Sequence, residues 1–89
     1  MKTNQINILL IDDNEKFLKS VADRAKLKGF NVFTALNGQQ ALELVEKHHI
    51  EVAVVDQRMP DMEGLSVIEK LRQRAPKIRT VLLTGHGDE

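Results

Sequence analysis

The sequence predicts an α/β domain built on a parallel sheet, and three observations support this fold class. Short aliphatic runs alternate along the chain with longer segments of helical spacing, an order that is typical of parallel sheets with helices on their faces. The runs ILLI, VAVV and TVLL are almost continuously apolar, as parallel strands buried on both faces are. Each of these three runs ends in a polar residue, and these residues are Asp12, Asp56 and Thr84.

Four short segments are the expected strands, because each is aliphatic and is separated from the next by a longer helical segment. Connections between neighbouring parallel strands are expected to be right-handed. The strands are predicted at Ile6–Ile11, Asn31–Thr34, Val52–Val55 and Arg79–Thr84.

The three segments between these strands have the spacing of amphipathic helices. The first is expected to begin after a cap at Asn14 and to end at Gly29. The second begins near Gly38, and the third stops before Pro76, which cannot continue a helix. Their apolar stripes are Phe17, Leu18, Val21, Ala22 and Ala25 in the first, Ala41, Leu42 and Val45 in the second, and Leu65, Ile68 and Leu71 in the third.

The composition limits the class of protein. The 89 residues correspond to one domain, with 42% hydrophobic and 29% charged residues, as in ordinary globular proteins. Thirteen basic and thirteen acidic residues balance, and no basic run favours nucleic-acid binding. The absence of cysteine excludes a disulfide framework and a thiol nucleophile. The apolar run Ile8–Ile11 is too short for a signal peptide or a membrane span, so a cytoplasmic protein is expected.

The acidic residues at the strand ends indicate a metal site. The carboxyl ends of parallel strands meet at one edge of the sheet, where ligands of such folds bind. Asp12, Asp13 and Asp56 should therefore lie close together, and their charges repel unless a cation is present. Mg²⁺ prefers such oxygen ligands, and no His/Cys cluster favours a softer metal.

A carboxylate beside Mg²⁺ can also act as a nucleophile and form an aspartyl phosphate. The Thr84 hydroxyl and backbone N–H groups near Gly85 are candidates to hold a phosphate oxygen, since glycine permits close approach. An alternative remains for each acid taken alone, because an aspartate after a strand is commonly a helix cap or a turn residue. The combination on three strand ends favours the site.

These motifs resemble the receiver domain of two-component response regulators, which has a flavodoxin-like (CheY-like) three-layer αβα fold. The matching stretches are ILLIDDNE, GFNVFTALNGQQALEL, VAVVDQRMPDMEG and TVLLTGHGDE. They occur in the family's order and cover essentially the whole chain. The resemblance implies a phosphoacceptor signalling domain, not an enzyme, with at most self-catalysed phosphotransfer and dephosphorylation.

The resemblance also implies roles for particular residues. Asp56 would receive a phosphoryl group from a sensor histidine kinase or a histidine phosphotransfer protein. Asp13, Asp56 and the backbone carbonyl of Arg58 would bind Mg²⁺ directly, and Asp12 would assist largely through water. Residues with further implied roles are Thr84 and Gly85, which would contact the phosphate, and Arg58 and His86, which would tune its hydrolysis.

The chain departs from the family at its end. The family's domain continues through a further helix, strand and helix, which include a lysine that contacts the phosphate and an aromatic switch residue. Residues 1–89 are therefore expected to form a C-terminally incomplete receiver domain of four strands and three helices, without an output domain. Its ending resembles receivers that precede transcription-factor domains, but neither nucleic-acid binding nor membrane binding by this chain is expected.

Two other functions remain open at this point. The incomplete sheet would favour a non-phosphorylated interaction module that dimerises through its open edge or by swapping elements. A small nucleotide-binding enzyme is disfavoured, because the chain has neither a G-x-G-x-x-G turn nor a GK[ST] motif.

Overall fold

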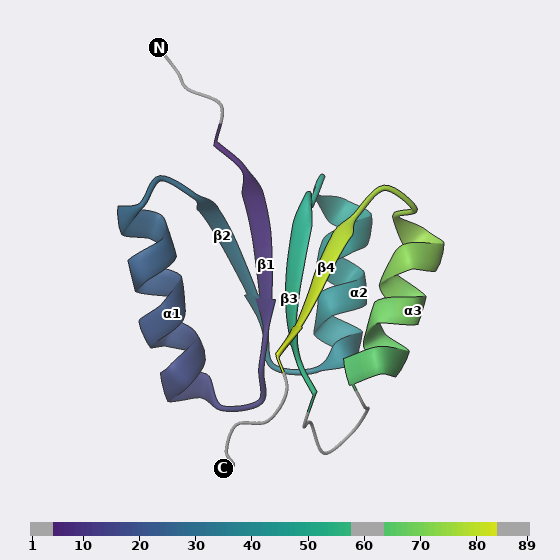
Figure 1. Cartoon of the computed structure of the whole chain (residues 1–89), viewed down its shortest axis with the longest axis horizontal. Helices are drawn as coiled ribbons and strands as arrows, with labels where there is room; N and C mark the ends of the chain where they lie inside the picture. Colours follow the sequence, from purple (N-terminus) through teal and green to yellow (C-terminus); the bar gives the residue numbers. More distant parts are fainter. Residues whose placement is uncertain (1–4, 58–63, 84–89) are drawn as a thin grey trace.

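The computed structural model describes residues 5–57 and 64–83, which alternate strictly between strands and helices (Figure 1). The predicted alternation is confirmed. The first three strands each differ from the predicted bounds by one residue at one end, and the predicted end of the fourth, Thr84, lies outside the described residues. The elements are β1 (Asn7–Ile11), α1 (Glu15–Leu27), β2 (Asn31–Ala35), α2 (Gly38–Lys47), β3 (Val52–Asp56), α3 (Gly64–Arg74) and β4 (Arg79–Leu83).

The four strands form one parallel sheet in the order β2-β1-β3-β4. Strand β1 lies at its centre, where Ile11 pairs with Ala35 of β2 and with Val55 of β3. Since all strands run the same way, their carboxyl ends share one edge of the sheet (Figure 1). The predicted parallel α/β architecture is therefore confirmed.

The helices make the fold a three-layer sandwich, with α1 on one face of the sheet and α2 and α3 on the other (Figure 1). The two faces differ in how much apolar surface they bury. On the α1 face the buried cluster consists of Leu10, Leu18 and Ala22. The cluster under α2 and α3 is much larger and consists of Leu9, Ile11, Ala35, Ala41, Leu42, Val45, Ile50, Ala53, Val55, Val67, Ile68, Leu71 and Ile78.

The helix ends follow from local sequence. The Asn14 side chain accepts a hydrogen bond from the Phe17 N–H at 3.1 Å, which confirms the predicted cap of α1. Helix α1 ends at Leu27, and Lys28 is its C-cap. The next residue, Gly29, has a φ of 98°, and the Phe30 N–H donates to the Ala25 carbonyl at 3.1 Å. This is a Schellman motif, which requires the left-handed conformation that glycine adopts without strain.

The prediction that the TVLL strand is buried on both faces is wrong. Strand β4 lies at the edge of the described sheet, and Val81 and Leu83 are 46% and 41% exposed. Helix α1 packs against β1 and β2. Within residues 5–57 and 64–83, no helix therefore covers the face of β4 that carries Val81 and Leu83. The apolar run TVLL does not show by itself whether its strand is central or at an edge. Only the strand order distinguishes the two positions.

Two residues assigned to apolar stripes are also exposed. Phe17 lies in the first turn of α1 and is 46% exposed, while Leu18 and Ala22 form the buried face of that helix. Leu65 is 54% exposed, and Val67 is buried in its place. The stripe predicted for α2 is confirmed, since all three of its residues are buried. None of the described helices is long and apolar enough to cross a bilayer.

Candidate functional site

The centre of the sheet contains the point where the chain reverses its direction of winding. Strands β1 and β3 are neighbours, but the helix that follows β1 packs on one face and the helix that follows β3 packs on the other (Figure 1). The two connections therefore diverge beyond the carboxyl ends of the strands, where ligands of open α/β sheets bind. Asp12 comes directly after β1, and Asp56 ends β3.

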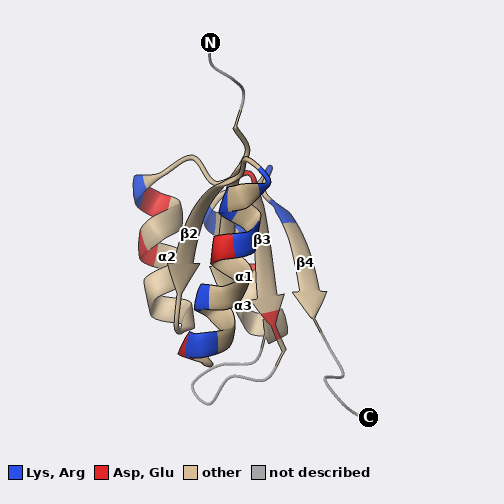
Figure 2. Cartoon of the chain, turned by 90° about the vertical axis from the view of Figure 1, so that its left-hand side faces the viewer, with Lys and Arg blue, Asp and Glu red and all other residues tan. Residues whose placement is uncertain are grey.

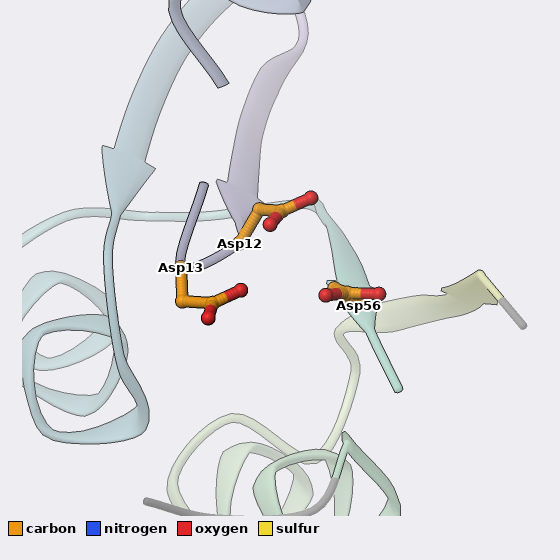
Figure 3. A group of neighbouring side chains, drawn as sticks. All are labelled: Asp12, Asp13 and Asp56. Atoms are coloured by element: carbon orange, nitrogen blue, oxygen red, sulfur yellow. The ribbon is translucent and has the colours of Figure 1, made fainter. Parts of the chain in front are cut away.

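Three carboxylates meet at this point. Each of Asp12, Asp13 and Asp56 offers an oxygen, and these oxygens all lie within 4.8 Å of one another (Figure 3). Asp12 and Asp56 are buried, at 6% and 3% exposure, whereas Asp13 is exposed. The predicted convergence of the three aspartates is confirmed.

Backbone hydrogen bonds hold the acidic positions in place. The Asp12 N–H donates to the Ala35 carbonyl at 3.1 Å, so the pairing of β1 with β2 extends into the site. On the other side, the Gln57 N–H donates to the Leu83 carbonyl at 3.0 Å. The carboxylate of Asp12 accepts from the Asn14 N–H at 2.9 Å, which ties the site to the start of α1.

The environment of Asp12 disfavours its charge. Burial raises the pKa of the Asp12 carboxyl above its usual value of 3.8, and the hydrogen bond from the Asn14 backbone partly offsets this effect. The neighbouring charges of Asp56 and Asp13 raise this pKa further. Without a cation, the charged form of Asp12 therefore lowers the stability of the folded state.

The three carboxylates fit a small divalent cation. Mg²⁺ binds oxygens at about 2.0–2.1 Å, so two oxygens on opposite sides of the ion would lie about 4.2 Å apart. Oxygens within 4.8 Å of one another need only a small shift to reach this spacing. Mg²⁺ also accepts a set of one or two carboxylates completed by water and phosphate oxygens.

The raised pKa of Asp12 leads to a test at neutral pH without Mg²⁺. A carboxyl whose pKa is higher in the folded state stabilises the fold at low pH, and this contribution is lost as the pH rises from 3.8 through the folded value. Asp12→Asn removes the charge but keeps an oxygen for the Asn14 N–H. We expect the variant to unfold at a higher urea concentration than the wild type at pH 7, with a smaller difference at pH 4.

The exposed Asp23 on α1 provides the matched control, and Asp23→Asn should leave the urea midpoint nearly unchanged. An Asp12→Asn variant that is less stable than the wild type at pH 7 would contradict the argument from burial and charge.

Gly64 is a site residue that was not among the predicted ones. It begins α3, and a Cβ atom there would lie 2.9 Å from the Asp56 carbonyl oxygen and 2.9 Å from the Gln57 Cα. The start of α3 therefore packs directly on the backbone that carries Asp56. A glycine at the first position of a helix, shortly after a strand, is the signal in the sequence.

The remaining candidates cannot be compared with the structure. Four residues assigned to phosphate binding, to the third metal ligand or to hydrolysis lie outside the described residues, and they are Arg58, Thr84, Gly85 and His86.

The fold and the site together define a class, namely a doubly wound α/β domain with a carboxylate cluster at the switch point of its sheet. The family model of the response regulator receiver domain matches residues 8–89. The chain therefore belongs to the response regulator receiver domain family. This is a family of phosphoacceptor signalling domains and not of catalytic enzymes.

Proteins of similar sequence differ in what surrounds the matched region. The chain is 41% identical over 81 residues to the photosynthetic apparatus regulatory protein RegA of Cereibacter sphaeroides, with 91% of the chain and 44% of that protein covered. It is 32% identical to a cyclic di-GMP phosphodiesterase of Thermotoga maritima, with 93% of the chain and 22% of that protein covered. The chain thus spans less than half the length of these relatives.

Solved structures have the same fold. A CheY-like receiver domain from Methanospirillum hungatei has a TM-score of 0.88 at 27% identity. The match covers 96% of this chain and 68% of the Methanospirillum chain. A Burkholderia pseudomallei response regulator, with a phosphorylated aspartic acid and a calcium ion, has a TM-score of 0.85 at 34% identity, with 94% and 49% covered. The TrrA protein of Thermotoga maritima, in complex with Mg²⁺ and BeF, has a TM-score of 0.84 at 25% identity, with 93% and 72% covered.

Proposed function

We propose that Asp56 is the phosphoacceptor of this domain and that a sensor histidine kinase or a histidine phosphotransfer protein supplies the phosphoryl group. One observation carries the assignment. Asp56 is the buried carboxylate that ends β3, and its oxygen lies within 4.8 Å of those of Asp12 and Asp13. The similarity to a response regulator with a phosphorylated aspartic acid and a calcium ion supports the same role.

In the proposed reaction, a carboxylate oxygen of Asp56 attacks the phosphorus of a phosphohistidine. The P–N bond breaks as the new P–O bond forms, and the histidine leaves with the electron pair of the broken bond. A bound Mg²⁺ supplies charge neutralisation between the acids and the incoming phosphoryl oxygens. Asp12 and Asp13 would hold this ion, and the backbone bonds around them keep their positions fixed before the phosphoryl group arrives.

The replacement Asp56→Asn tests the assignment. Asparagine has nearly the same shape but lacks the nucleophilic oxygen pair, so we expect labelling by acetyl phosphate with Mg²⁺ to fall below detection in an intact-mass measurement. The matched control is Asp23→Asn, which removes an exposed carboxylate of α1 and should be labelled like the wild type. Addition of EDTA should abolish labelling of both proteins that retain Asp56.

Labelling of Asp56→Asn at the wild-type level would disprove the assignment. Circular dichroism shows whether the Asp56→Asn variant is folded. A folded variant that is not labelled supports the proposal. If the variant is unfolded, Asp56→Glu is tested in its place. That variant retains a carboxylate but displaces it by one methylene group from its position in the cluster, so strongly reduced labelling is expected.

A specific observation favours a second function, that of an interaction module. Strand β4 is at the edge of the described sheet and leaves Val81 and Leu83 partly exposed, and such edges pair with other chains. Under this hypothesis the chain dimerises and is not labelled at Asp56. Light scattering on the samples used for labelling distinguishes the two, since a labelled monomer favours the phosphoacceptor and an unlabelled dimer favours the interaction module.

The proposal extends to residues outside the described ranges. Arg58 would contribute its backbone carbonyl to the cation, and Thr84 and Gly85 would contact the phosphoryl group. Arg58 and His86 would tune hydrolysis of the aspartyl phosphate. A kinase partner would also make this a cytoplasmic protein. The longer relatives include a transcriptional regulatory protein of Escherichia coli and a cyclic di-GMP phosphodiesterase, which supports a role in regulating transcription or a second-messenger enzyme as part of a larger protein.

A further inference from the structure

A hollow of about 810 Å³ lies at the end of the sheet opposite the acidic cluster. The first residues of β3 and β4 border the hollow. Val52 therefore lines it, whereas Asp56 lies at the opposite end of the same strand, in the acidic cluster. Its volume is within the range of about 300–1,000 Å³ that is typical of small-molecule sites. The hollow is open to solvent on one side, and it is bordered by the end of α2 with the connection to β3, by the connection from α3 to β4, and by Ile6.

Backbone hydrogen bonds hold these walls together. The Glu51 N–H donates to the Asn7 carbonyl at 2.9 Å, and the Arg79 N–H donates to the Glu51 carbonyl at 3.0 Å. The Ile78 N–H donates to the Ala75 carbonyl at 3.0 Å, which closes the turn between α3 and β4. The hollow is therefore pre-formed by the fold, as small-molecule sites usually are.

The floor of the hollow is apolar. Val45, Ile50 and Ile78 line it, and they are 9%, 4% and 6% exposed. All three belong to the larger core cluster under α2 and α3, and each leaves only a small part of its surface open to the hollow. Ala75 and Pro76 add further carbon surface to one wall. Ile6 also lines the hollow and is 42% exposed. An apolar ligand body would cover this remaining carbon surface and remove it from water.

The rim carries positive charge. Lys77 and Arg79 line the hollow and are exposed, and neither has an ion-pair partner within residues 5–57 and 64–83. Arg74 also lines it but is paired with Glu46. In Figure 2 the start of β4 is blue and the far end of β3 is red, so this rim and the acidic cluster lie at opposite ends of the sheet.

Among the described residues, Glu51 provides the one acidic group on this lining, and the position of its carboxylate matters because it would repel a ligand anion. Its Oε1 accepts a hydrogen bond from the Asn7 N–H at 2.7 Å, which holds it toward the start of β1. The charges without partners on the rim, among the described residues, are thus those of Lys77 and Arg79.

We propose that this hollow binds a small amphiphilic anion, with a compact apolar body against the floor and one carboxylate, sulfonate or phosphate group at Lys77 and Arg79. The site is separate from the phosphoacceptor site and does not depend on its chemistry. Binding there is expected in the whole chain whether or not Asp56 is phosphorylated.

Naphthalenesulfonate is a suitable probe, since it combines a flat apolar body with one anionic group. In amide correlation spectra of the ¹⁵N-labelled chain, we expect saturable shifts at residues 48–52 and 74–79. The double variant Lys77→Gln/Arg79→Gln should weaken the dissociation constant about fivefold, in line with the strength of exposed charge pairs. The double variant Lys19→Gln/Lys26→Gln removes two exposed lysines of α1 and should leave it unchanged.

Neutral naphthalenemethanol separates the two contributions, because it should bind the same residues about fivefold more weakly than the sulfonate in the wild type and equally in both variants. Shifts that centre on Val81 and Leu83 would mean that the exposed face of β4 binds the probe, and they would overturn the proposal. Equal affinity of the sulfonate for the wild type and for Lys77→Gln/Arg79→Gln would overturn it as well.

Discussion

Replacement of Leu9 by alanine is expected to destabilise the fold by about 2–5 kcal/mol, because it leaves a cavity that the surrounding structure fills only in part. Leu9 is fully buried in the central strand β1 and belongs to the larger core cluster. A domain of this size has a total stability of about 4–13 kcal/mol, so the variant should lose a large share of it. Urea unfolding followed by circular dichroism measures the change as a lower midpoint.

Leu27→Ala is the matched control, since the same side chain is truncated at a position that is 87% exposed. It should change the stability by no more than about 0.5 kcal/mol. Equal losses of unfolding free energy in Leu9→Ala and Leu27→Ala would contradict the prediction that the buried Leu9 side chain stabilises the core.

Replacement of Gly64 by alanine is expected to cost about 1–3 kcal/mol, as overpacking does elsewhere, even though alanine favours helices. The added Cβ would lie 2.7 Å from a Leu82 methyl carbon and 2.9 Å from each of two backbone atoms, the Asp56 carbonyl oxygen and the Gln57 Cα. The Leu82 side chain can move, but the backbone of β3 is held by hydrogen bonds on both sides. The collision therefore displaces the residue that carries the proposed phosphoacceptor.

We expect Gly64→Ala to lower both the urea midpoint and the rate of labelling of Asp56 by acetyl phosphate. Gly29→Ala provides the comparison. A Cβ atom at Gly29 would meet no other atom within 4 Å, but the residue has a φ of 98°, so alanine there costs about 1–2 kcal/mol through backbone strain alone. Its labelling should remain at the wild-type rate, and a normal labelling rate in Gly64→Ala would contradict the proposed displacement.

Much of the fold was predictable because the relevant signals are local. The alternation of apolar runs and helical segments, the cap at Asn14 and the glycine end of α1 all depend on residues a few positions apart. The meeting of Asp12, Asp13 and Asp56 was predictable for a different reason. In a parallel sheet the strand ends share one edge, so residues far apart in sequence are brought together by topology alone.

The features that were missed depend on packing between distant segments. The sequence of β4 is as apolar as that of β3, and its exposure follows from the order of the strands. Only the resemblance to the family, and not the apolar pattern, led to the expectation of an open sheet edge. The close packing of Gly64 on the end of β3 follows from the position of α3. The expected incompleteness of the domain and the roles of Arg58, Thr84, Gly85 and His86 stay predictions, because no described residue tests them.

The unequal burial on the two faces of the sheet has a consequence for local opening. Stability is not uniform within a domain, and segments with few buried contacts open and exchange their amide hydrogens first. Helix α1 buries only Leu18 and Ala22, whereas α2 and α3 close over the larger cluster. Asp13 and Asn14 directly precede α1, so each partial detachment of this helix would also loosen one side of the acidic cluster. Occupancy of that cluster by a cation would in turn slow hydrogen exchange along α1, and the weakest layer of the fold would report on its chemical centre.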